Sequence, residues 1–200
     1  MLVKHNNNSI SNLTSPGQLA QGKMTLISSQ TASGSASIEF TSGIDSTYPI
    51  YRFEFINIHP STGSAFTFQG STNTGSSYGV TITSTSFRAY HYENDSGTAL
   101  EYRTGNDLAQ STSFQKLSDN VQADNDTGLS GYGFIYNPSS STFVKHFMFN
   151  VSLVNTTDIM LNPYTAGYFN TTSSIDAIQF KMASGNIDSG TIKLYGIKGD

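Results

Sequence analysis

Alternation of apolar and polar residues with a period of two is the feature that most restricts the folds open to this chain. It is clearest between residues 175 and 200. One side of an extended backbone would carry the apolar side chains of two successive runs there: Ile178, Phe180 and Met182, then Ile192 and Leu194. Because successive strand side chains point to opposite faces of a sheet, each run buries one face and wets the other. Both runs therefore indicate β-strands.

The segment between these two runs, residues 184–190, is a turn by composition. It contains two glycines, and Asn186 and Asp188 are of residue types whose side chains commonly hydrogen-bond to the nearby backbone in turns. We predict a hairpin with a long loop, whose second strand lies inside a sheet.

The same alternation recurs along the rest of the chain. It is strongest at residues 50–58, where Tyr51, Phe53 and Phe55 share a face opposite Arg52 and Glu54. Further expected strands cover residues 24–27, 36–40, 66–69, 80–83, 87–92, 100–103, 131–136, 143–153, 159–161 and 167–169. In the strand at 143–153, one face is shared by Lys145 and the apolar residues Phe143, Phe147, Phe149 and Val151. Residues 104–125 are the least strand-like, with room for a short helix between 108 and 117.

Ten to twelve short strands separated by turns predict an all-β protein. We expect an antiparallel two-sheet β-sandwich, with a jelly roll as the best architecture, as a single domain over residues 23–200. The chain has 200 residues, enough for one such domain. Residues 1–22 are expected to be an extended N-terminal arm, because they contain too few apolar side chains to bury themselves. The arm is either a loose terminus or a segment that becomes ordered on a neighbouring subunit.

Charge and composition exclude several kinds of partner and chemistry. The ten Lys and Arg residues are scattered and the net charge is −4, so nucleic acid is not expected as a partner. The absence of cysteine excludes disulfides and thiolate chemistry. We find no apolar run long enough for a membrane span and no leader peptide, so we expect the chain to be made and folded in a cytoplasm.

The usual motifs of catalysis and metal binding are missing. Residues 124–126 carry carboxylate and amide oxygens, but the following residues do not match a calcium-binding loop, and a solvated turn is the better interpretation. The four histidines, His5, His59, His91 and His146, lack metal-ligand spacing. There is no Gly-x-Ser-x-Gly elbow. We therefore expect no catalytic residues, no metal and no cofactor.

Two sets of residues remain as candidates. Carboxylates in or beside strands could pair for glycoside hydrolysis, but pairing with Arg52, Arg88 or Arg103 on a wet face is the stronger interpretation. These carboxylates are Glu39, Glu54, Glu93 and Glu101. Five tyrosines could instead form a platform on which sugars stack, although such aromatics more often belong to a core or a subunit interface. They are Tyr90, Tyr92, Tyr102, Tyr132 and Tyr164.

Three stretches together resemble a known group of proteins. They are HNNNSISNLTS near the N-terminus, MTLISSQTASGSASIEFTSGIDSTYPIYRFEFINI from residue 24, and SSIDAIQFKMASGNIDSGTIKLYGI from residue 173. They resemble virion structural proteins of tailed bacteriophages, especially marine ones. The resemblance covers most of the chain but consists of turns and strand patterns. It implies a jelly-roll head decoration (cement) protein or a part of a tail appendage.

The resemblance does not separate these two settings, but a compact domain with an arm and without a heptad-repeat rod favours decoration. We therefore expect a non-enzymatic capsid decoration protein located in the virion and assembled in the host cytoplasm. It would be a homotrimer that binds the major capsid protein or other virion proteins. Its assembly arm would comprise His5, Asn6, Asn7, Asn8, Ser9 and Ile10. The alternative is a receptor- or glycan-binding module of a tail fibre or other virion appendage. A polysaccharide-degrading enzyme is the third possibility.

Overall fold

A computed structural model of the protein describes residues 24–198, which form twelve β-strands and no helix. The strands are β1 (Met24–Thr31), β2 (Ile38–Phe40), β3 (Ile50–Pro60), β4 (Ser64–Ser71), β5 (Ile82–Tyr92), β6 (Thr98–Tyr102), β7 (Gln115–Val121), β8 (Leu129–Tyr136), β9 (Lys145–Val154), β10 (Ile159–Phe169), β11 (Ala177–Met182) and β12 (Ile187–Ile197). Over this part of the chain, no helix has the length and apolar character needed to cross a membrane.

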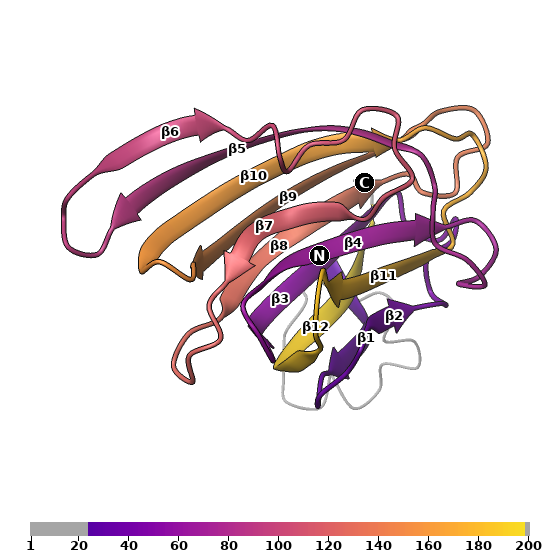
Figure 1. Ribbon diagram of the computed structural model, residues 1–200. Helices are drawn as coiled ribbons and strands as arrows, with labels where there is room; N and C mark the ends of the chain where they lie inside the picture. Colours follow the sequence, from indigo (N-terminus) through magenta and orange to yellow (C-terminus); the bar gives the residue numbers. More distant parts are fainter. Residues whose placement is uncertain (1–23, 199–200) are drawn as a thin grey trace, which may run out of the picture.

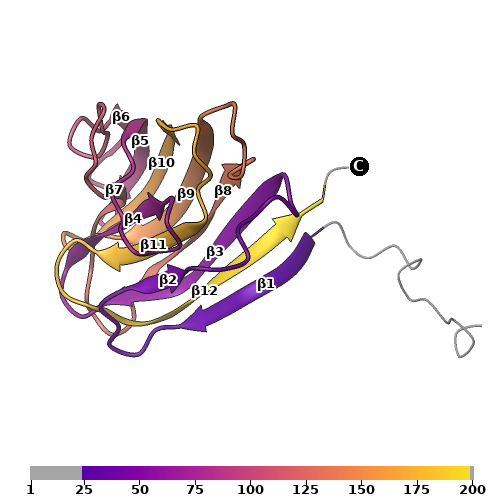
Figure 2. The same cartoon turned by 90° about the vertical axis from the view of Figure 1, so that its right-hand side faces the viewer.

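The strands form two antiparallel sheets packed face to face, so the predicted β-sandwich is confirmed (Figure 1). The larger sheet has the order β1-β12-β3-β8-β9-β10-β5-β6, and the smaller sheet has the order β2-β11-β4-β7. Viewed after a 90° turn, β1 forms one edge of the larger sheet and the β5–β6 hairpin lies at the other (Figure 2).

Eight of the twelve strands have the arrangement of a jelly roll. The four strands β1-β12-β3-β8 face the four strands β2-β11-β4-β7, and the chain passes from sheet to sheet at nearly every connection between them. The other four strands are two insertions: β5 and β6 lie between β4 and β7 in the sequence, and β9 and β10 lie between β8 and β11. All four join the larger sheet beyond β8 and extend it past the smaller one (Figure 1).

The core between the sheets is built mainly from phenylalanine. Phe180 of the smaller sheet meets Phe53 and Phe55 of the larger sheet, with ring centroids 5.0 and 5.2 Å apart. Nine of the thirteen phenylalanines are buried: Phe40, Phe53, Phe55, Phe66, Phe68, Phe147, Phe149, Phe169 and Phe180. Burying each such side chain contributes roughly 2–3 kcal/mol, so these rings are the main force holding the two layers together.

The strongest predicted strand forms as expected but contains an irregularity. Tyr51, Phe53 and Phe55 are buried on one face of β3. Asn57 has a positive φ of 49°, and the pairing with β8 shifts register between Phe55 and Ile58. This β-bulge adds one residue, so that Ile58 also points into the core.

The predicted C-terminal hairpin is wrong, although both of its strands exist. β11 pairs with β2 and β4 in the smaller sheet, whereas β12 pairs with β1 and β3 in the larger sheet. Residues 183–186 therefore connect the two layers. The prediction that the last strand lies inside a sheet is confirmed, since β12 has a neighbour on each side.

Three other boundaries differ from the prediction. Residues 80–92 were expected to form two strands and 159–169 another two, but β5 and β10 are each one continuous strand of 11 residues. Serine, threonine and glycine in their middles weaken the apolar alternation without interrupting the backbone. Residues 108–117, where the sequence left room for a short helix, contain none, and β7 begins at Gln115.

Candidate binding face on the larger sheet

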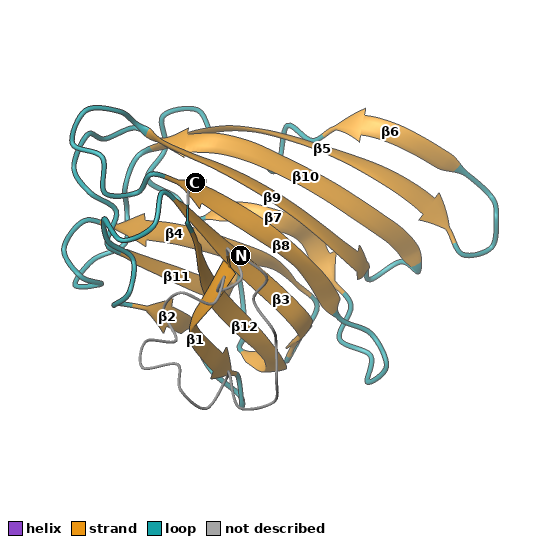
Figure 3. Cartoon of the chain, turned by 180° about the vertical axis from the view of Figure 1, so that it is seen from behind, coloured by secondary structure: helices purple, strands orange, loops and turns teal. Residues whose placement is uncertain are grey.

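The inserted strands turn an unusual set of side chains away from the smaller sheet, on the surface that faces the viewer in Figure 3. In β8 the large aromatics Tyr132, Phe134 and Tyr136 point outward, while Gly133 and Ile135 are buried against the core. These three aromatics alternate along the strand predicted at residues 131–136 and so share one face. That face is the outer one.

Strand register brings aromatic residues from four strands into one row. Tyr102 of β6 pairs with Phe87 of β5, and Phe87 pairs with Tyr164 of β10. Tyr164 pairs with Asn150 of β9, which pairs with Tyr132 of β8. Neighbouring positions in such a row are about 4.8 Å apart, so the side chains can contact one another across the sheet.

The outward side chains of β5, β6, β8, β9 and β10 define what we call the aromatic face. They are Thr83, Thr85, Phe87, Ala89, His91, Thr98, Leu100, Tyr102, Ser130, Tyr132, Phe134, Tyr136, His146, Met148, Asn150, Ser152, Met160, Asn162, Tyr164, Ala166 and Tyr168. None of them is Lys, Arg, Asp or Glu. Leu100 and Met148 keep 72% and 54% of their surface exposed. Exposed apolar surface without charges is typical of interaction sites.

Asn150 lies at a break in the hydrogen-bond ladder of this face. Pro163 of β10 has no backbone N–H, and the β9–β10 pairing is interrupted around it, between Leu161 and Tyr164. Two side-chain amides bridge the gap: Asn150 Nδ2 donates to Pro163 O at 3.1 Å, and Asn162 Nδ2 donates to Val151 O at 2.6 Å. Both amides are thereby held flat against the sheet.

Tyr164 and Tyr132 lie on either side of Asn150, and another side chain packs against one face of each ring. Phe87 stacks on Tyr164 with the ring planes 6° apart and the centroids separated by 5.2 Å. The guanidinium of Arg52 on β3 lies 5.0 Å from the centroid of the Tyr132 ring. Since β5 and β3 lie on the far sides of β10 and β8 from β9, the free face of each ring is turned towards Asn150. We call these three residues, Tyr132, Asn150 and Tyr164, the aromatic slot.

A shallow hollow of about 550 Å³ adjoins the slot along the strands. Tyr136, His146 and Tyr168 line one part of it, and Met148 and Ala166 lie beside them. The small side chains of Ala166 on β10 and of Thr83 and Thr85 on β5 also line this hollow. The charge of Arg52, at the border of the aromatic face, is balanced by Glu54 at 3.0 Å.

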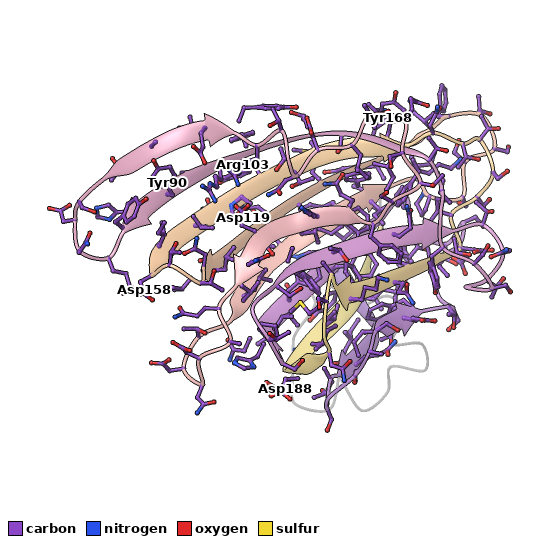
Figure 4. The ribbon with its side chains drawn as sticks, in the orientation of Figure 1. Tyr90, Arg103, Asp119, Asp158, Tyr168 and Asp188 are labelled. Carbon is purple, nitrogen blue, oxygen red and sulfur yellow. The ribbon has the colours of Figure 1, made fainter. Side chains whose placement is uncertain are left out.

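The opposite side of the inserted strands carries a charged network. Arg88 of β5 donates to Glu101 of β6 and to Asp119 of β7, and Arg103 Nη2 donates to Asp119 Oδ1 at 2.9 Å. Burial opposes the charge of Asp119, but hydrogen bonds and positive charge from Arg103 and Arg88 outweigh it and lower the pKa of Asp119. The network ties the β5–β6 hairpin to β7, as Figure 4 shows for Arg103 and Asp119.

The five candidate tyrosines do not form one platform. Tyr102, Tyr132 and Tyr164 belong to the aromatic face. Tyr90 and Tyr92 alternate with the outward residues of β5, so they lie on the other side, where Arg88 approaches Tyr90 to 5.4 Å. Figure 4 shows Tyr90 near Arg103 and Asp119. Asn150, Phe87 and Tyr168 were missed. The signal for them was cross-strand register, which one sequence does not reveal.

Three of the four candidate carboxylates have ordinary partners, and the fourth, Glu93, is exposed. Glu54 pairs with Arg52, and Glu101 pairs with Arg88 and Arg103, as the sequence favoured. Glu39 instead accepts hydrogen bonds from Ser37, Gln179 and Tyr78. Burial, together with the charge and hydrogen bond of Glu39, raises the pKa of Tyr78 to about 12.

Histidines and aspartates do not converge. His59 lies 3.7 Å from Asp188, His91 lies 3.0 Å from Asp95, and His146 packs against Tyr168. Asp124 of the predicted solvated turn accepts a hydrogen bond from Gln122. Within residues 24–198, no group of three or more such side chains is arranged to hold a metal ion.

The residues predicted for the assembly arm, 5–10, lie outside the part of the chain that the structure describes; they include the fourth histidine, His5. No protein-family model and no curated protein matches the chain.

Proposed function

We propose that this chain is a non-enzymatic binding protein and that the aromatic face is its contact surface. The observation that carries this proposal is the composition of that face: aromatic and methionine side chains over five strands, without a single Lys, Arg, Asp or Glu. Interface centres are enriched in aromatic residues and methionine and depleted of Lys, Asp and Glu. A folded chain gains nothing by leaving such a surface in water, so a partner is needed to explain it.

The setting that we propose is the virion of a tailed bacteriophage, on the basis of the sequence resemblance and the jelly-roll arrangement. As a capsid decoration protein, the chain would form a homotrimer that binds the major capsid protein or other virion proteins. Its arm, residues 1–22, would reach the shell, and the aromatic face would pack against neighbouring subunits. Contacts repeated by symmetry would offset the entropy lost when the arm becomes ordered.

The second candidate is a receptor- or glycan-binding module of a tail fibre or other appendage. The specific observation in its favour is the aromatic slot, in which two tyrosine rings turn their free faces towards a neutral amide. In this role the aromatic face would remain accessible in the particle.

Placing a negative charge on the aromatic face tests the binding role. Met148→Glu and Leu100→Glu change exposed side chains, so the domain should remain folded. We expect each to weaken self-association or particle binding at least about tenfold, as measured by sedimentation, because the charge would have to be desolvated without a partner. Ser173→Glu, exposed in the β10–β11 connection, is the matched control and should change neither. Equal behaviour of all three variants would contradict the proposal.

Copy number in purified particles separates the two settings. Quantitative mass spectrometry against the major capsid protein should give hundreds of copies for a decoration protein and at most a few tens for an appendage. Absence of the chain from particles would overturn the virion setting altogether.

A further inference from the structure

Resting on the second candidate for the proposed function, in which the aromatic face stays accessible, we infer that the aromatic slot binds a sugar ring of a neutral glycan, and that the adjoining hollow receives the next unit of the same chain. This assigns a ligand class and a position to the contact surface. Three features of the described residues carry the inference: the spacing of the rings, the polar groups between them, and the charge of the surroundings.

The spacing leaves room for one ring. Tyr132 and Tyr164 are on strands β8 and β10, which flank β9, so their backbones are roughly 9.6 Å apart at a strand spacing of about 4.8 Å. A ring held between two aromatic faces needs about 3.5–4 Å on each side for van der Waals contact. The short side chain of Asn150, bonded to Pro163 O, lies at the floor and does not fill the gap.

Neighbouring side chains fix the rings of Tyr132 and Tyr164 in positions where a ligand can stack on them. Phe87 supports Tyr164 from β5, and Arg52 supports Tyr132 from β3. Tyr132 and Tyr164 nevertheless keep 40% and 41% of their surface exposed. A rigid aromatic side chain loses little conformational entropy when a ligand binds, so supported rings of this kind favour affinity. The apolar C–H faces of a sugar ring complement such surfaces.

The polar groups suit a ligand with many hydroxyls. Asn150 uses its Nδ2 group on Pro163 O, and its Oδ1 receives no hydrogen bond from residues 24–198, so it can accept one from a ligand hydroxyl. The tyrosine hydroxyls at the slot, and those of Tyr136 and Tyr168 beside the hollow, can each donate or accept. A site of this type is mostly apolar, with a few polar groups that orient the ligand.

The charge of the surroundings selects a neutral ligand. The outward residues of the five strands include no Lys, Arg, Asp or Glu. Arg52, on the strand beside Tyr132, is paired with Glu54, and the Asp107 carboxylate accepts a hydrogen bond from Tyr102 at the far end of the row, on β6. An acidic or basic ligand would lose its hydration here without gaining an opposite charge, which is costly. An uncharged glycan avoids that cost.

Tyrosine fluorescence offers a direct test, because the chain has eleven tyrosines and no tryptophan. The full-length protein would be titrated with four neutral hexasaccharides, cellohexaose, laminarihexaose, xylohexaose and mannohexaose, and with acidic hexagalacturonate. We expect at least one neutral probe to bind saturably, with confirmation by calorimetry, and the acidic probe to bind more weakly. Tyr132→Ala and Tyr164→Ala should each weaken binding about tenfold.

Two sets of variants keep the test informative. Tyr132→Phe and Tyr164→Phe retain the stacking rings and should keep most of the affinity. Tyr90→Ala makes the same change on the opposite side of β5 and should leave binding intact. Circular dichroism of every variant checks the fold.

The outcomes separate this inference from the proposed function. If no neutral probe binds and the two alanine variants instead dissociate an oligomer, the slot is a protein interface: the glycan inference falls and the binding role stands. If neither sugar binding nor self-association involves the slot, both fall. Equal or tighter binding of hexagalacturonate would overturn the assignment to neutral ligands.

Discussion

Lys145 is a lysine in the place of a core residue. It begins β9 and shares its face with Phe147 and Phe149, as the sequence pattern predicted. Phe143, predicted on the same face, precedes the strand and keeps 69% of its surface exposed. The side chain has no exposed surface, and its Nζ donates to Thr171 O at 3.1 Å. Burial lowers the pKa of Lys145, because the charged form loses its hydration. A carbonyl oxygen compensates for that loss less well than a carboxylate would.

Replacing Lys145 by methionine should therefore stabilise the protein at neutral pH. The folded state has the lower pKa, so the cost of burying the charge is fully present below that pKa. It disappears as the pH rises towards the ordinary value of 10.5. We expect Lys145→Met to raise the free energy of unfolding by about 1 kcal/mol at pH 7, with a smaller gain above pH 10.

Denaturant unfolding of both proteins at several pH values provides the measurement. Lys193→Met, a half-buried position on the outer side of β12, serves as the control and should stay within about 0.5 kcal/mol of the parent. A Lys145→Met variant that is less stable than the parent at pH 7 would show that the hydrogen bond to Thr171 outweighs the buried charge.

At the scale of elements, β8 shows how small residues inside the core permit large ones outside it. Gly133 is opposite Phe149 on β9, and a Cβ atom at Gly133 would overlap the Phe149 ring. The ring lies over the glycine, on the core side of the sheet. The same strand can then carry Tyr132 and Phe134 on its outer side without needing bulk on both.

Gly133→Ala is accordingly expected to destabilise the protein by about 2–3 kcal/mol, because Phe149 would have to leave its rotamer and disturb the phenylalanine core. Thermal and denaturant unfolding would measure the change. Gly105→Ala is the matched control: a Cβ there meets nothing within 4 Å, so stability should be unchanged or slightly higher. A Gly133→Ala protein as stable as the parent would contradict this account of the packing.

The positions of the strands in the sequence could be predicted better than the pairing of the strands with one another. Alternation identified the buried faces of β3, β11 and β12, because a period of two is a local property. Pairing is not local: β11 and β12 are neighbours in sequence with matching patterns, yet they belong to different sheets. The aromatic slot could not be predicted from the sequence for the same reason, since Tyr132, Asn150 and Tyr164 come together only through the register of three strands.

The hydrophobicity of the side chains on β8 does not show which face of this strand is buried. Tyr132, Phe134 and Tyr136 look like a core stripe by hydrophobicity alone. Gly133, which lies between Tyr132 and Phe134, leaves the space that the Phe149 ring occupies. That packing decides which face is buried, and it exists only once β9 is in place.

At the scale of the whole molecule, stability and binding belong to different strands. The eight strands of the jelly roll enclose most of the phenylalanine core, whereas the four inserted strands, with β8, present the aromatic face. The inserted strands are anchored from the core side by Phe147 and Phe169 and by the Arg88–Asp119 network. Outward residues on them can therefore change with little cost to the fold, which suits a surface that must match a partner.

Residues 1–22, the predicted arm, allow a test of the same separation. β1 begins at Met24 and pairs with β12 from there onwards, so removing residues 1–22 takes nothing from the described sandwich. We expect the truncated protein to unfold at the same temperature as the full chain, within about 2 °C, because its core and strand pairs are intact.

If the arm binds the shell, truncation should abolish binding to particles that lack the native protein, as measured by cosedimentation. Met148→Glu, with its arm intact, should lose contacts between subunits but retain residual attachment to the shell. Unchanged particle binding by the truncated protein would place the attachment on the sandwich and make the aromatic face the sole contact to test.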